Sequence, residues 1–366
     1  MAKKVLHVFG IMNRGGAELR TLSLMPALKA KGVEFEFCAL SGQLGVLDES
    51  INAVGSQVHY CKLGVGFFWR FYRLLKQQQF DVVHSHVSLV SGVMLWIAWL
   101  AGVPLRIAHF RNTTDVENIS VVRQWRDKLL KRMILSKAHH VLAVCEGALQ
   151  GYWSECWQQD KRFKVIYNGF ERPELETQDN FWQQYINQYD NGVVITNVAR
   201  MDYQKNHLRQ AKIFAEYLAL NNQAWLVFIG KENRRVRQTV EDFCQQQGIR
   251  ERVVFLGEQA KVLPFLRHSQ LMLFPSMWEG LPGAVIEAAS VGTPVVASDI
   301  PGVLEIASAL TLVSPLSLQS TDVQWAQKIA DVLAKPMSQQ DVVAEFDHSQ
   351  FQINANVDAL HAIYTK

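Results

Sequence analysis

Short apolar runs alternate with longer amphipathic stretches through the first 170 residues of the chain. The apolar runs have the length of buried strands and occur at residues 4–9, 35–40, 58–61, 82–84, 105–109, 140–144 and 163–166. The stretches between them carry apolar residues at helical spacing, at residues 17–31, 68–79, 88–101 and 122–136. Strands that alternate with helices in this way predict a parallel, doubly wound sheet in an α/β fold.

The same alternation restarts near residue 193, after a polar stretch at 171–180 that contains a proline and has no strand pattern. Strands are predicted there at residues 193–198, 224–229, 253–256, 271–274, 294–297 and 310–313, and a last helix at 351–364. The sequence therefore predicts two Rossmann-like domains that face a central cleft. Their expected bounds are 1–170 and 171–350, with a terminal helix in 351–366 that packs back toward the N-terminal domain.

The composition supports a globular protein and excludes several other classes. Of 366 residues, 49% are hydrophobic and 19% are charged, which rules out a disordered or coiled-coil chain. The net charge of +3, from 37 Lys and Arg against 34 Asp and Glu, gives no support for a nucleic-acid partner. The cysteines are odd in number and lack metal-ligand spacing, which predicts buried free thiols in a reducing cytosol; they are Cys38, Cys61, Cys145, Cys156 and Cys244.

The chain shows no membrane-spanning segment in its pattern. It runs from two N-terminal lysines directly into a strand, without the apolar segment of a secretory signal. The most apolar stretch, at 89–102, is shorter than the roughly 20 residues that cross a bilayer. We expect a cytoplasmic protein in which this stretch, with Trp96 and Trp99, forms a buried core helix.

Two loops have residues suited to phosphate. Gly15 and Gly16 follow the first strand, where backbone N–H groups at a helix start can approach an anion; a plain tight turn is the alternative. The spacing is not GxGxxG, which counts against a nicotinamide-dependent oxidoreductase. Arg200 and Lys205 follow the first strand of the second half and suit a diphosphate, or else they form a solvated basic loop.

The sharpest motif is Phe-Pro-Ser-Met-Trp-Glu-Gly-Leu-Pro-Gly-Ala-Val-Ile-Glu-Ala, at residues 274–288. Glu279 is expected in a Gly- and Pro-rich loop, and Glu287 about a turn inside the helix that follows. A carboxylate can accept paired hydrogen bonds from a vicinal diol, which sugars and ribose both offer. The alternative is one helix-capping and one surface glutamate.

With these motifs the chain resembles the retaining glycosyltransferases of family 4, which have the GT-B fold, over nearly its whole length. The bacterial polysaccharide-biosynthesis branch is the most similar. The segments that carry the resemblance are GGAE (15–18), RIAHFRN (106–112), VIYNGF (165–170), NVARMDYQKNH (197–207) and FPSMWEGLPGAVIEA (274–288).

The resemblance implies roles for individual residues. Arg200 and Lys205 would hold the donor diphosphate and neutralise the leaving group, Glu279 would face the donor sugar, and Glu287 would bind the ribose hydroxyls. His109 would lie near the reacting sugar. The remaining donor-binding positions would contact phosphate, sugar or base through the backbone; they are Gly15, Gly16, Gly280, Leu281, Pro282, Gly283 and Val262.

The implied reaction is transfer with retention of anomeric configuration from a nucleotide-diphosphate sugar, with UDP expected and GDP as the alternative. No cofactor or metal is expected, since Arg200, Lys205 and a helix dipole supply the positive charge. His84 and His86 also lie at a strand end, but a metal site would need further ligands. They are expected to line the cleft or to serve the structure.

The acceptor is expected to be a saccharide or a lipid-linked saccharide. Two stretches, at 67–76 and 122–132, combine tryptophan and phenylalanine with arginine and lysine. Such helices suit peripheral contact with an anionic membrane, here the inner face of the plasma membrane; aromatic core faces are the alternative. Two other functions stay open, a nucleotide-sugar epimerase or hydrolase on the same fold and a non-catalytic nucleotide-sugar-binding protein.

Overall fold

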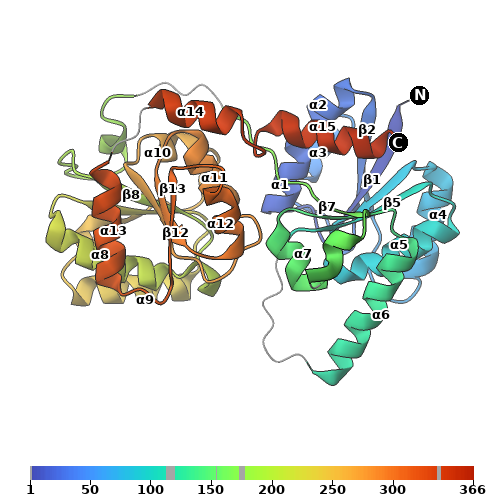
Figure 1. Ribbon diagram of the computed structural model, residues 1–366, viewed down its shortest axis with the longest axis horizontal. Helices are drawn as coiled ribbons and strands as arrows, with labels where there is room; N and C mark the ends of the chain where they lie inside the picture. The colour runs from blue at the N-terminus through green and yellow to red at the C-terminus, as the bar shows by residue number, and fades with distance from the viewer. Residues whose placement is uncertain (1, 113–119, 154, 173–177, 336–338) are drawn as a thin grey trace. The chain divides into compact units, whose positions relative to one another are not determined.

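The computed structural model describes residues 2–112, 120–153, 155–172, 178–335 and 339–366. The chain divides into two compact units, residues 1–169 with 353–366 and residues 170–352. The first division lies one residue from the boundary expected at 170, and the C-terminal helix belongs to the first unit. Each unit is a parallel sheet with helices on both of its faces (Figure 1), as the alternation of strands and helices predicts.

Unit 1 has a seven-stranded parallel sheet in the order β3-β2-β1-β4-β5-β6-β7. Its strands are β1 (Lys3–Phe9), β2 (Val33–Ala39), β3 (Val58–Tyr60), β4 (Val82–Ser85), β5 (Leu105–Phe110), β6 (His140–Ala143) and β7 (Phe163–Val165). Its α-helices are α1 (Gly16–Ser23), α2 (Met25–Ala30), α3 (Asp48–Ala53), α4 (Phe67–Gln78), α5 (Ser91–Leu100), α6 (Val121–Lys137), α7 (Glu146–Trp153) and α15 (Ile353–Tyr364).

One face of this sheet is covered by α1, α2 and the C-terminal helix α15, which lies alongside α2 (Figure 1). Side chains alternate between the faces of a strand, so alternate residues of β1, such as Val5 and Phe9, lie on this face. They share a buried apolar cluster with Leu360 and Ile363 of α15. Apolar burial against the sheet therefore fixes the end of the chain to the N-terminal unit.

Unit 2 has a six-stranded parallel sheet in the order β10-β9-β8-β11-β12-β13. Its strands are β8 (Val194–Val198), β9 (Trp225–Ile229), β10 (Val253–Phe255), β11 (Leu271–Phe274), β12 (Val295–Ser298) and β13 (Val313–Leu316). Its α-helices are α8 (His207–Leu220), α9 (Arg234–Gln246), α10 (Leu263–Arg267), α11 (Gly283–Ser290), α12 (Pro301–Ala307), α13 (Asp322–Leu333) and α14 (Gln339–Asp347). Separate apolar clusters cover its two faces, one built on Phe214 and Trp325 and the other on Trp182 and Phe265.

Two elements differ from their predictions, and proline explains both. The single helix expected at 17–31 is two helices, because Pro26 at the start of α2 cannot donate a backbone hydrogen bond to the preceding turn. The last strand lies at Val313–Leu316 and overlaps the expected 310–313 at one residue only. It contains Pro315, which a strand pattern rejects but an edge strand such as β13 tolerates.

The apolar stretch at 89–102 also differs from its prediction. It forms the short 3₁₀ turn Ser88–Val90 and α5, but Trp96 and Trp99 of α5 are exposed rather than buried in the core. The ammonium of Lys137 lies over the Trp99 ring, 3.3 Å from its centroid. Among the described residues, no helix is both long and apolar enough to cross a membrane.

Candidate active site

The predicted donor residues of unit 2 lie where the order of its strands reverses. The strand β8 has β9 on one side and β11 on the other, and the loops that leave β8 and β11 follow the carboxyl ends of neighbouring strands. Open α/β sheets bind ligands at such a point. The loop after β8 carries Arg200 and Lys205, and the loop after β11 carries Glu279. The topology therefore brings together residues that are more than 70 positions apart.

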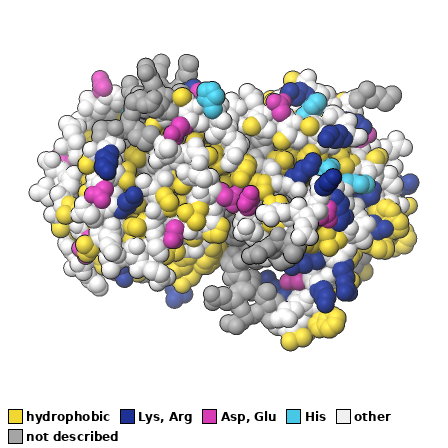
Figure 2. Space-filling view, viewed as in Figure 1, with side chains coloured by type: hydrophobic (Ala, Val, Ile, Leu, Met, Phe, Trp, Pro, Cys, Tyr) yellow, Lys and Arg dark blue, Asp and Glu magenta, His cyan; other side chains and the backbone are white. Residues whose placement is uncertain are grey.

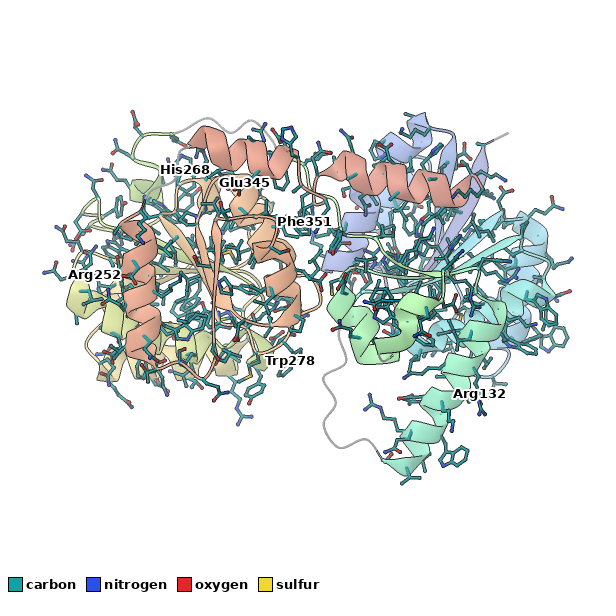
Figure 3. All side chains as sticks on the ribbon, viewed as in Figure 1. Arg132, Arg252, His268, Trp278, Glu345 and Phe351 are labelled. Atoms are coloured by element: carbon teal, nitrogen blue, oxygen red, sulfur yellow. The ribbon has the colours of Figure 1, made fainter. Side chains whose placement is uncertain are left out.

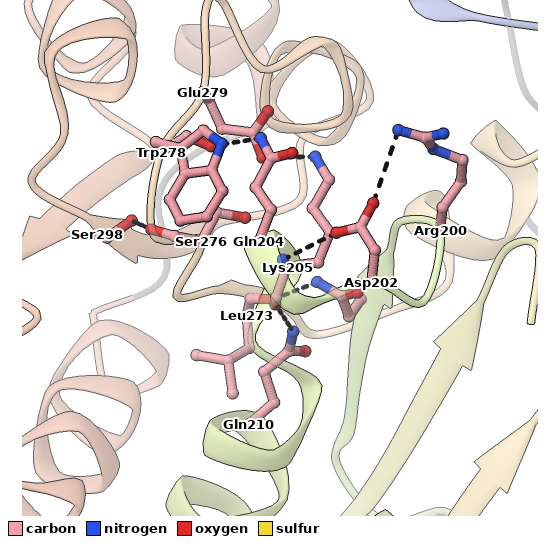
Figure 4. A network of polar contacts seen from close by, with 11 residues as sticks. Arg200, Asp202, Gln204, Lys205, Gln210, Leu273, Ser276, Trp278, Glu279 and Ser298 are labelled. Carbon is pink, nitrogen blue, oxygen red and sulfur yellow. Dashed lines mark hydrogen bonds and ion pairs between the residues drawn. The ribbon is translucent and has the colours of Figure 1, made fainter. Parts of the chain in front are cut away.

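Hydrogen bonds join these two loops directly (Figure 4). The Met277 N–H donates to the Gln204 carbonyl at 2.9 Å, and the Gln204 side-chain amide donates to the carbonyl of Trp278. The Asn206 side chain donates to the Pro275 carbonyl at 3.2 Å. One backbone–backbone bond and two side-chain-to-backbone bonds thus hold the loops in one arrangement without a ligand.

At the centre of the joined loops, the Lys205 ammonium donates to the Glu279 carboxylate (Figure 4). Their side chains are only 15% and 10% exposed. Burial raises the pKa of Glu279 above its ordinary value, and the neighbouring Lys205 opposes that shift without cancelling it. The structure thus places a carboxylate with a raised pKa against a positioned ammonium, and both were predicted site residues.

Three further residues position Lys205, and none of them was among the predicted site residues. The Asp202 carboxylate accepts a hydrogen bond from the Lys205 backbone N–H at 3.3 Å. The buried Gln210 of α8 donates its side-chain amide to the Lys205 carbonyl at 2.8 Å. Asn206 follows with a positive φ of 57°, a left-handed conformation that asparagine tolerates better than most residues. The chain therefore turns sharply into α8 directly after Lys205.

Arg200 differs from Lys205 in its surroundings. Its side chain is 70% exposed, and its guanidinium lies 3.6 Å from the Asp202 carboxylate, too far for a close hydrogen-bonded pair. An ion pair of such an exposed arginine contributes little to the stability of the protein. Arg200 can therefore turn toward an incoming anion, whereas Lys205 is already held in place.

The remaining predicted donor residues surround the start of α11. Gly280, Leu281 and Pro282 are buried, Gly283 begins the helix, and the half-buried Glu287 is its fifth residue. Backbone N–H groups at a helix start favour an anion. The backbone is tightly packed here: a Cβ on Gly302 of the next helix would lie 1.7 Å from the Gly280 carbonyl oxygen.

Val262 is the predicted donor residue that lies in neither of these loops nor in α11. It precedes α10 and packs against the apolar cluster that contains Phe265 and Trp182. The strand that precedes it, β10, is two positions from β8 in the sheet. A contact between the nucleotide base and the backbone at 257–262 stays a prediction.

In unit 1, the predicted glycines lie at the start of α1. Gly15 precedes the helix, and a Cβ there would lie 2.2 Å from the Glu18 carboxylate, so that a larger residue would displace Glu18. Gly16 is exposed and has open space around its Cα. The two residues thus differ: a side chain at Gly15 would move the Glu18 carboxylate, and Gly16 leaves room at the helix N-terminus.

The predicted residue His109 belongs to a buried cluster of four histidines. His7 of β1 pairs in register with His84 of β4, and His84 with Ile107 of β5, so His86 and His109 extend from the same face of the sheet. All four side chains are buried. The proposed contact of His109 with a sugar stays a prediction, because its side chain is only 1% exposed here.

Three members of this cluster have the spacing of metal ligands. One ring nitrogen from each of His7, His84 and His86 lies within 4.8 Å of the others. However, the Arg111 guanidinium donates to His86 Nδ1 at 3.2 Å, and a second cation beside it would be repelled. Burial, and secondarily Arg111, lowers the pKa of His7 well below its ordinary value. The sequence singled out His84 and His86 but missed His7 and Arg111.

Comparison with known proteins places both units in one family. A family model described as glycosyl transferases group 1 matches residues 178–345, and one described as Glycosyltransferase Family 4 matches residues 14–172. The capsular polysaccharide biosynthesis glycosyltransferase CapH of Staphylococcus aureus is 32% identical over 365 residues, which cover 99% of this chain and 98% of CapH.

Two further proteins are similar over part or all of the chain. The UDP-Gal:alpha-D-GlcNAc-diphosphoundecaprenol alpha-1,3-galactosyltransferase of Escherichia coli is 26% identical over 246 residues, 63% of this chain and 61% of that protein. The crystal structure of Anabaena HepE in complex with UDP matches the fold with a TM-score of 0.82 and 16% identity over 100% of both chains. The chain therefore belongs to the family 4 glycosyltransferases, and its two Rossmann-like units are the two domains of their GT-B fold.

Proposed function

We propose that the protein is a retaining glycosyltransferase that moves a sugar from a UDP-sugar to a saccharide or lipid-linked saccharide in the synthesis of a surface polysaccharide. The observation that carries the proposal is the Lys205–Glu279 pair at the strand reversal of unit 2, with Arg200 nearby. Both loops are fixed by hydrogen bonds, and the pair combines a cation for phosphate with a carboxylate for sugar hydroxyls.

Charge supplies most of the catalysis in this proposal. An ammonium has three N–H donors, and Glu279 uses one of those on Lys205, which leaves donors for a diphosphate oxygen. The exposed Arg200 can bind the same group through two N–H donors. Positive groups aimed at the departing oxygens stabilise the transition state of bond cleavage, and no metal is needed in this scheme.

In this proposal the sugar passes directly from donor to acceptor, without a covalent intermediate on the protein. The bond from the anomeric carbon to the β-phosphate oxygen breaks, and its electron pair stays on that oxygen. The acceptor hydroxyl oxygen bonds to the same face of the anomeric carbon, and its proton passes to the leaving phosphate. In this scheme Glu279 accepts hydrogen bonds from the sugar hydroxyls and forms no bond to the anomeric carbon.

The names of the similar proteins support the choice of substrates. The Escherichia coli relative is named for UDP-Gal and for a diphosphoundecaprenol-linked acceptor, and the Anabaena structure contains UDP. CapH is named for capsular polysaccharide biosynthesis. We therefore propose UDP rather than GDP as the nucleotide, and a lipid-linked saccharide as the first acceptor to test.

The function is tested by incubating the purified protein with a panel of UDP-sugars, with and without free or lipid-linked saccharides. We expect UDP release that requires the acceptor, and a product whose anomeric proton coupling matches that of the donor. Equal consumption of donor without acceptor would identify an epimerase or hydrolase. Binding without consumption would identify a non-catalytic protein, and an inverted product would contradict retention.

Replacing Glu287 with alanine is expected to raise the KM for the donor about tenfold to a hundredfold, because hydrogen bonds from ribose hydroxyls to a carboxylate are lost. Turnover at saturating donor should change much less, since Glu287 lies away from the reacting bond in this proposal. Steady-state kinetics with the donor as the varied substrate measures both. Glu216→Ala, an exposed glutamate of α8, is the matched control; a Glu287→Ala variant with unchanged KM would contradict the ribose role.

Unit 1 has exposed aromatic and basic residues that suit a membrane surface. On α4, Phe67 and Phe71 are buried, but Trp69 is 68% exposed. On α6, Trp125 is also 68% exposed, and the helix carries several lysines and arginines, including the exposed Arg132 (Figure 3). In Figure 2, Lys and Arg side chains gather over α6 next to hydrophobic ones. The two tryptophans are thus not core residues, which favours the proposed peripheral contact with an anionic membrane.

The membrane contact predicts that the protein floats with liposomes containing anionic lipids at low salt. Trp125→Ser should reduce the bound fraction several-fold, because the ring would no longer enter the headgroup region. Val323→Ser, an exposed apolar residue on α13 of unit 2, is the control and should leave binding unchanged. Failure of the wild-type protein to float at low salt would rule out the contact.

A further inference from the structure

A row of three buried side chains links the C-terminal helix to His109. Tyr364, on the last turn of α15, contacts His84 through its hydroxyl, which lies 2.6 Å from His84 Nδ1. His84 Nε2 lies 3.0 Å from His109 Nδ1. Among the described residues, His109 Nε2 has no hydrogen-bond partner. The row therefore ends on one free ring nitrogen of the histidine that was predicted to face the sugar.

Both imidazoles of the row are neutral, because burial lowers the pKa of His84 and of His109 well below the ordinary value. A neutral imidazole has one N–H and one acceptor nitrogen. The row can then be arranged in two ways. Either Tyr364 donates to His84, which donates to His109 Nδ1, or His109 Nδ1–H donates to His84, which donates to Tyr364.

Unsatisfied groups distinguish the two arrangements. If His84 donated to Tyr364, two buried groups would be unsatisfied among the described residues: the hydroxyl hydrogen of Tyr364, whose hydrogen-bond partner is His84, and the acceptor nitrogen Nε2 of His109. Each buried polar group without a partner is costly. If Tyr364 donates, only one group is unpaired, the N–H on His109 Nε2, so this arrangement leaves fewer buried polar groups unsatisfied.

We propose that Tyr364 and His84 are positioning residues that hold His109 as the Nε2-protonated tautomer. The inference rests on the proposed function and deepens it: His109 then offers an N–H to an oxygen of the donor substrate and cannot take a proton from the acceptor. The proton of the acceptor therefore goes to the leaving phosphate and not to this histidine.

A second row in the same cluster is polarised in the same sense. Arg111 has only donors, so its contact with His86 Nδ1 makes that nitrogen an acceptor and leaves the proton of His86 on Nε2. His86 Nε2 lies 2.9 Å from His7 Nδ1, so His7 is also protonated on Nε2. The rings of His84 and His86 stack with centroids 4.3 Å apart. In this row the donor-only guanidinium sets the tautomer, and in the first row the Tyr364 hydroxyl has the same effect when it donates.

The experiment is two-bond nitrogen–proton NMR of the full-length protein with ¹⁵N-labelled histidine, in which loss of signals in His109→Gln assigns His109. We expect the Nε2-protonated pattern in the wild type. In Tyr364→Phe, both arrangements leave one donor and one acceptor unsatisfied, so His109 should become a mixture of tautomers. The ratio kcat/KM should fall in proportion to the lost tautomer, about twofold for an equal mixture.

Tyr217→Phe is the matched control, since Tyr217 is a buried tyrosine of unit 2 whose loss should leave the His109 signals unchanged. Thermal unfolding shows whether each variant is folded. A wild type protonated on Nδ1, or a folded Tyr364→Phe variant with an unchanged tautomer, would overturn the proposal. So would a tautomer mixture with unchanged kcat/KM. The NMR readout needs no substrate, so absence of transfer activity would contradict only the proposed function.

Discussion

Replacing Lys205 with alanine is expected to lower kcat by about 10²–10³-fold, the loss typical when one preorganised positive donor is removed from a developing anion. The ammonium is fixed before substrate binds, because Asp202 and Gln210 hold its backbone and Glu279 holds its head group. Preorganised charge needs no rearrangement in the transition state, so its removal should appear in turnover. Steady-state kinetics at saturating donor measures this loss.

The stability of the Lys205→Ala variant should change much less than its turnover. Breaking a buried ion pair often costs about 3–5 kcal/mol because a charge is left unpaired. Here the pKa of Glu279 is already raised by burial, and the carboxyl group can take up a proton instead. Urea unfolding should therefore show a loss of about 1–2 kcal/mol, against about 4 kcal/mol of transition-state stabilisation for a 10³-fold effect.

Two variants separate this role from a structural one. Lys212→Ala removes an exposed lysine of α8 and should change neither turnover nor stability. Lys205→Ala combined with Glu279→Gln should recover stability, because no buried charge remains, but should recover no turnover. Equal free-energy losses in turnover and in stability for Lys205→Ala would show that the lysine serves the fold.

Most of the fold was predictable because each buried strand carries its own apolar run. The run at 271–274 has the bounds of β11, and the other strands apart from β13 shift by one or two residues at their ends. The errors arise where local chemistry conflicts with tertiary context. Pro26 divides a continuous helical pattern, and Pro315 lies in an edge strand that needs fewer backbone donors.

The candidate site was predictable only in part, for a different reason. Arg200 and Lys205 lie in one dense motif and Glu279 and Glu287 in another, so the sequence alone predicts them as site residues. Gln210 acts on Lys205 through a carbonyl, and a glutamine on a helix gives no local signal of that contact.

His7, Arg111 and Tyr364 come from β1, from the end of β5 and from the last helix. They meet only because the strand order places β1, β4 and β5 side by side and α15 on the same face. The sequence of one chain does not show that these three residues are close together in the fold.

Glu279→Gln is expected to lower kcat about 10²-fold and to change how stability depends on pH. The amide can still accept a hydrogen bond from Lys205, so the pair keeps its geometry, but the negative charge that faces the sugar and its developing positive charge is lost. If the ionised carboxylate is the active form, the acid limb of the wild-type kcat profile should lie above pH 4.5, the ordinary pKa of a glutamate, because burial raises the pKa of Glu279.

The direction of the stability effect follows from the same raised pKa. A carboxyl group that binds its proton more tightly in the folded state than in the unfolded state costs stability when it is ionised. That cost is fully present above the folded pKa and disappears as the pH falls through it. Glu279→Gln should therefore unfold at a higher temperature than the wild type at pH 7, and the difference should vanish below pH 4.5. Glu216→Gln should match the wild type at every pH. A Glu279→Gln variant less stable than the wild type at pH 7 would show that the attraction between Lys205 and Glu279 exceeds the cost of burying their charges.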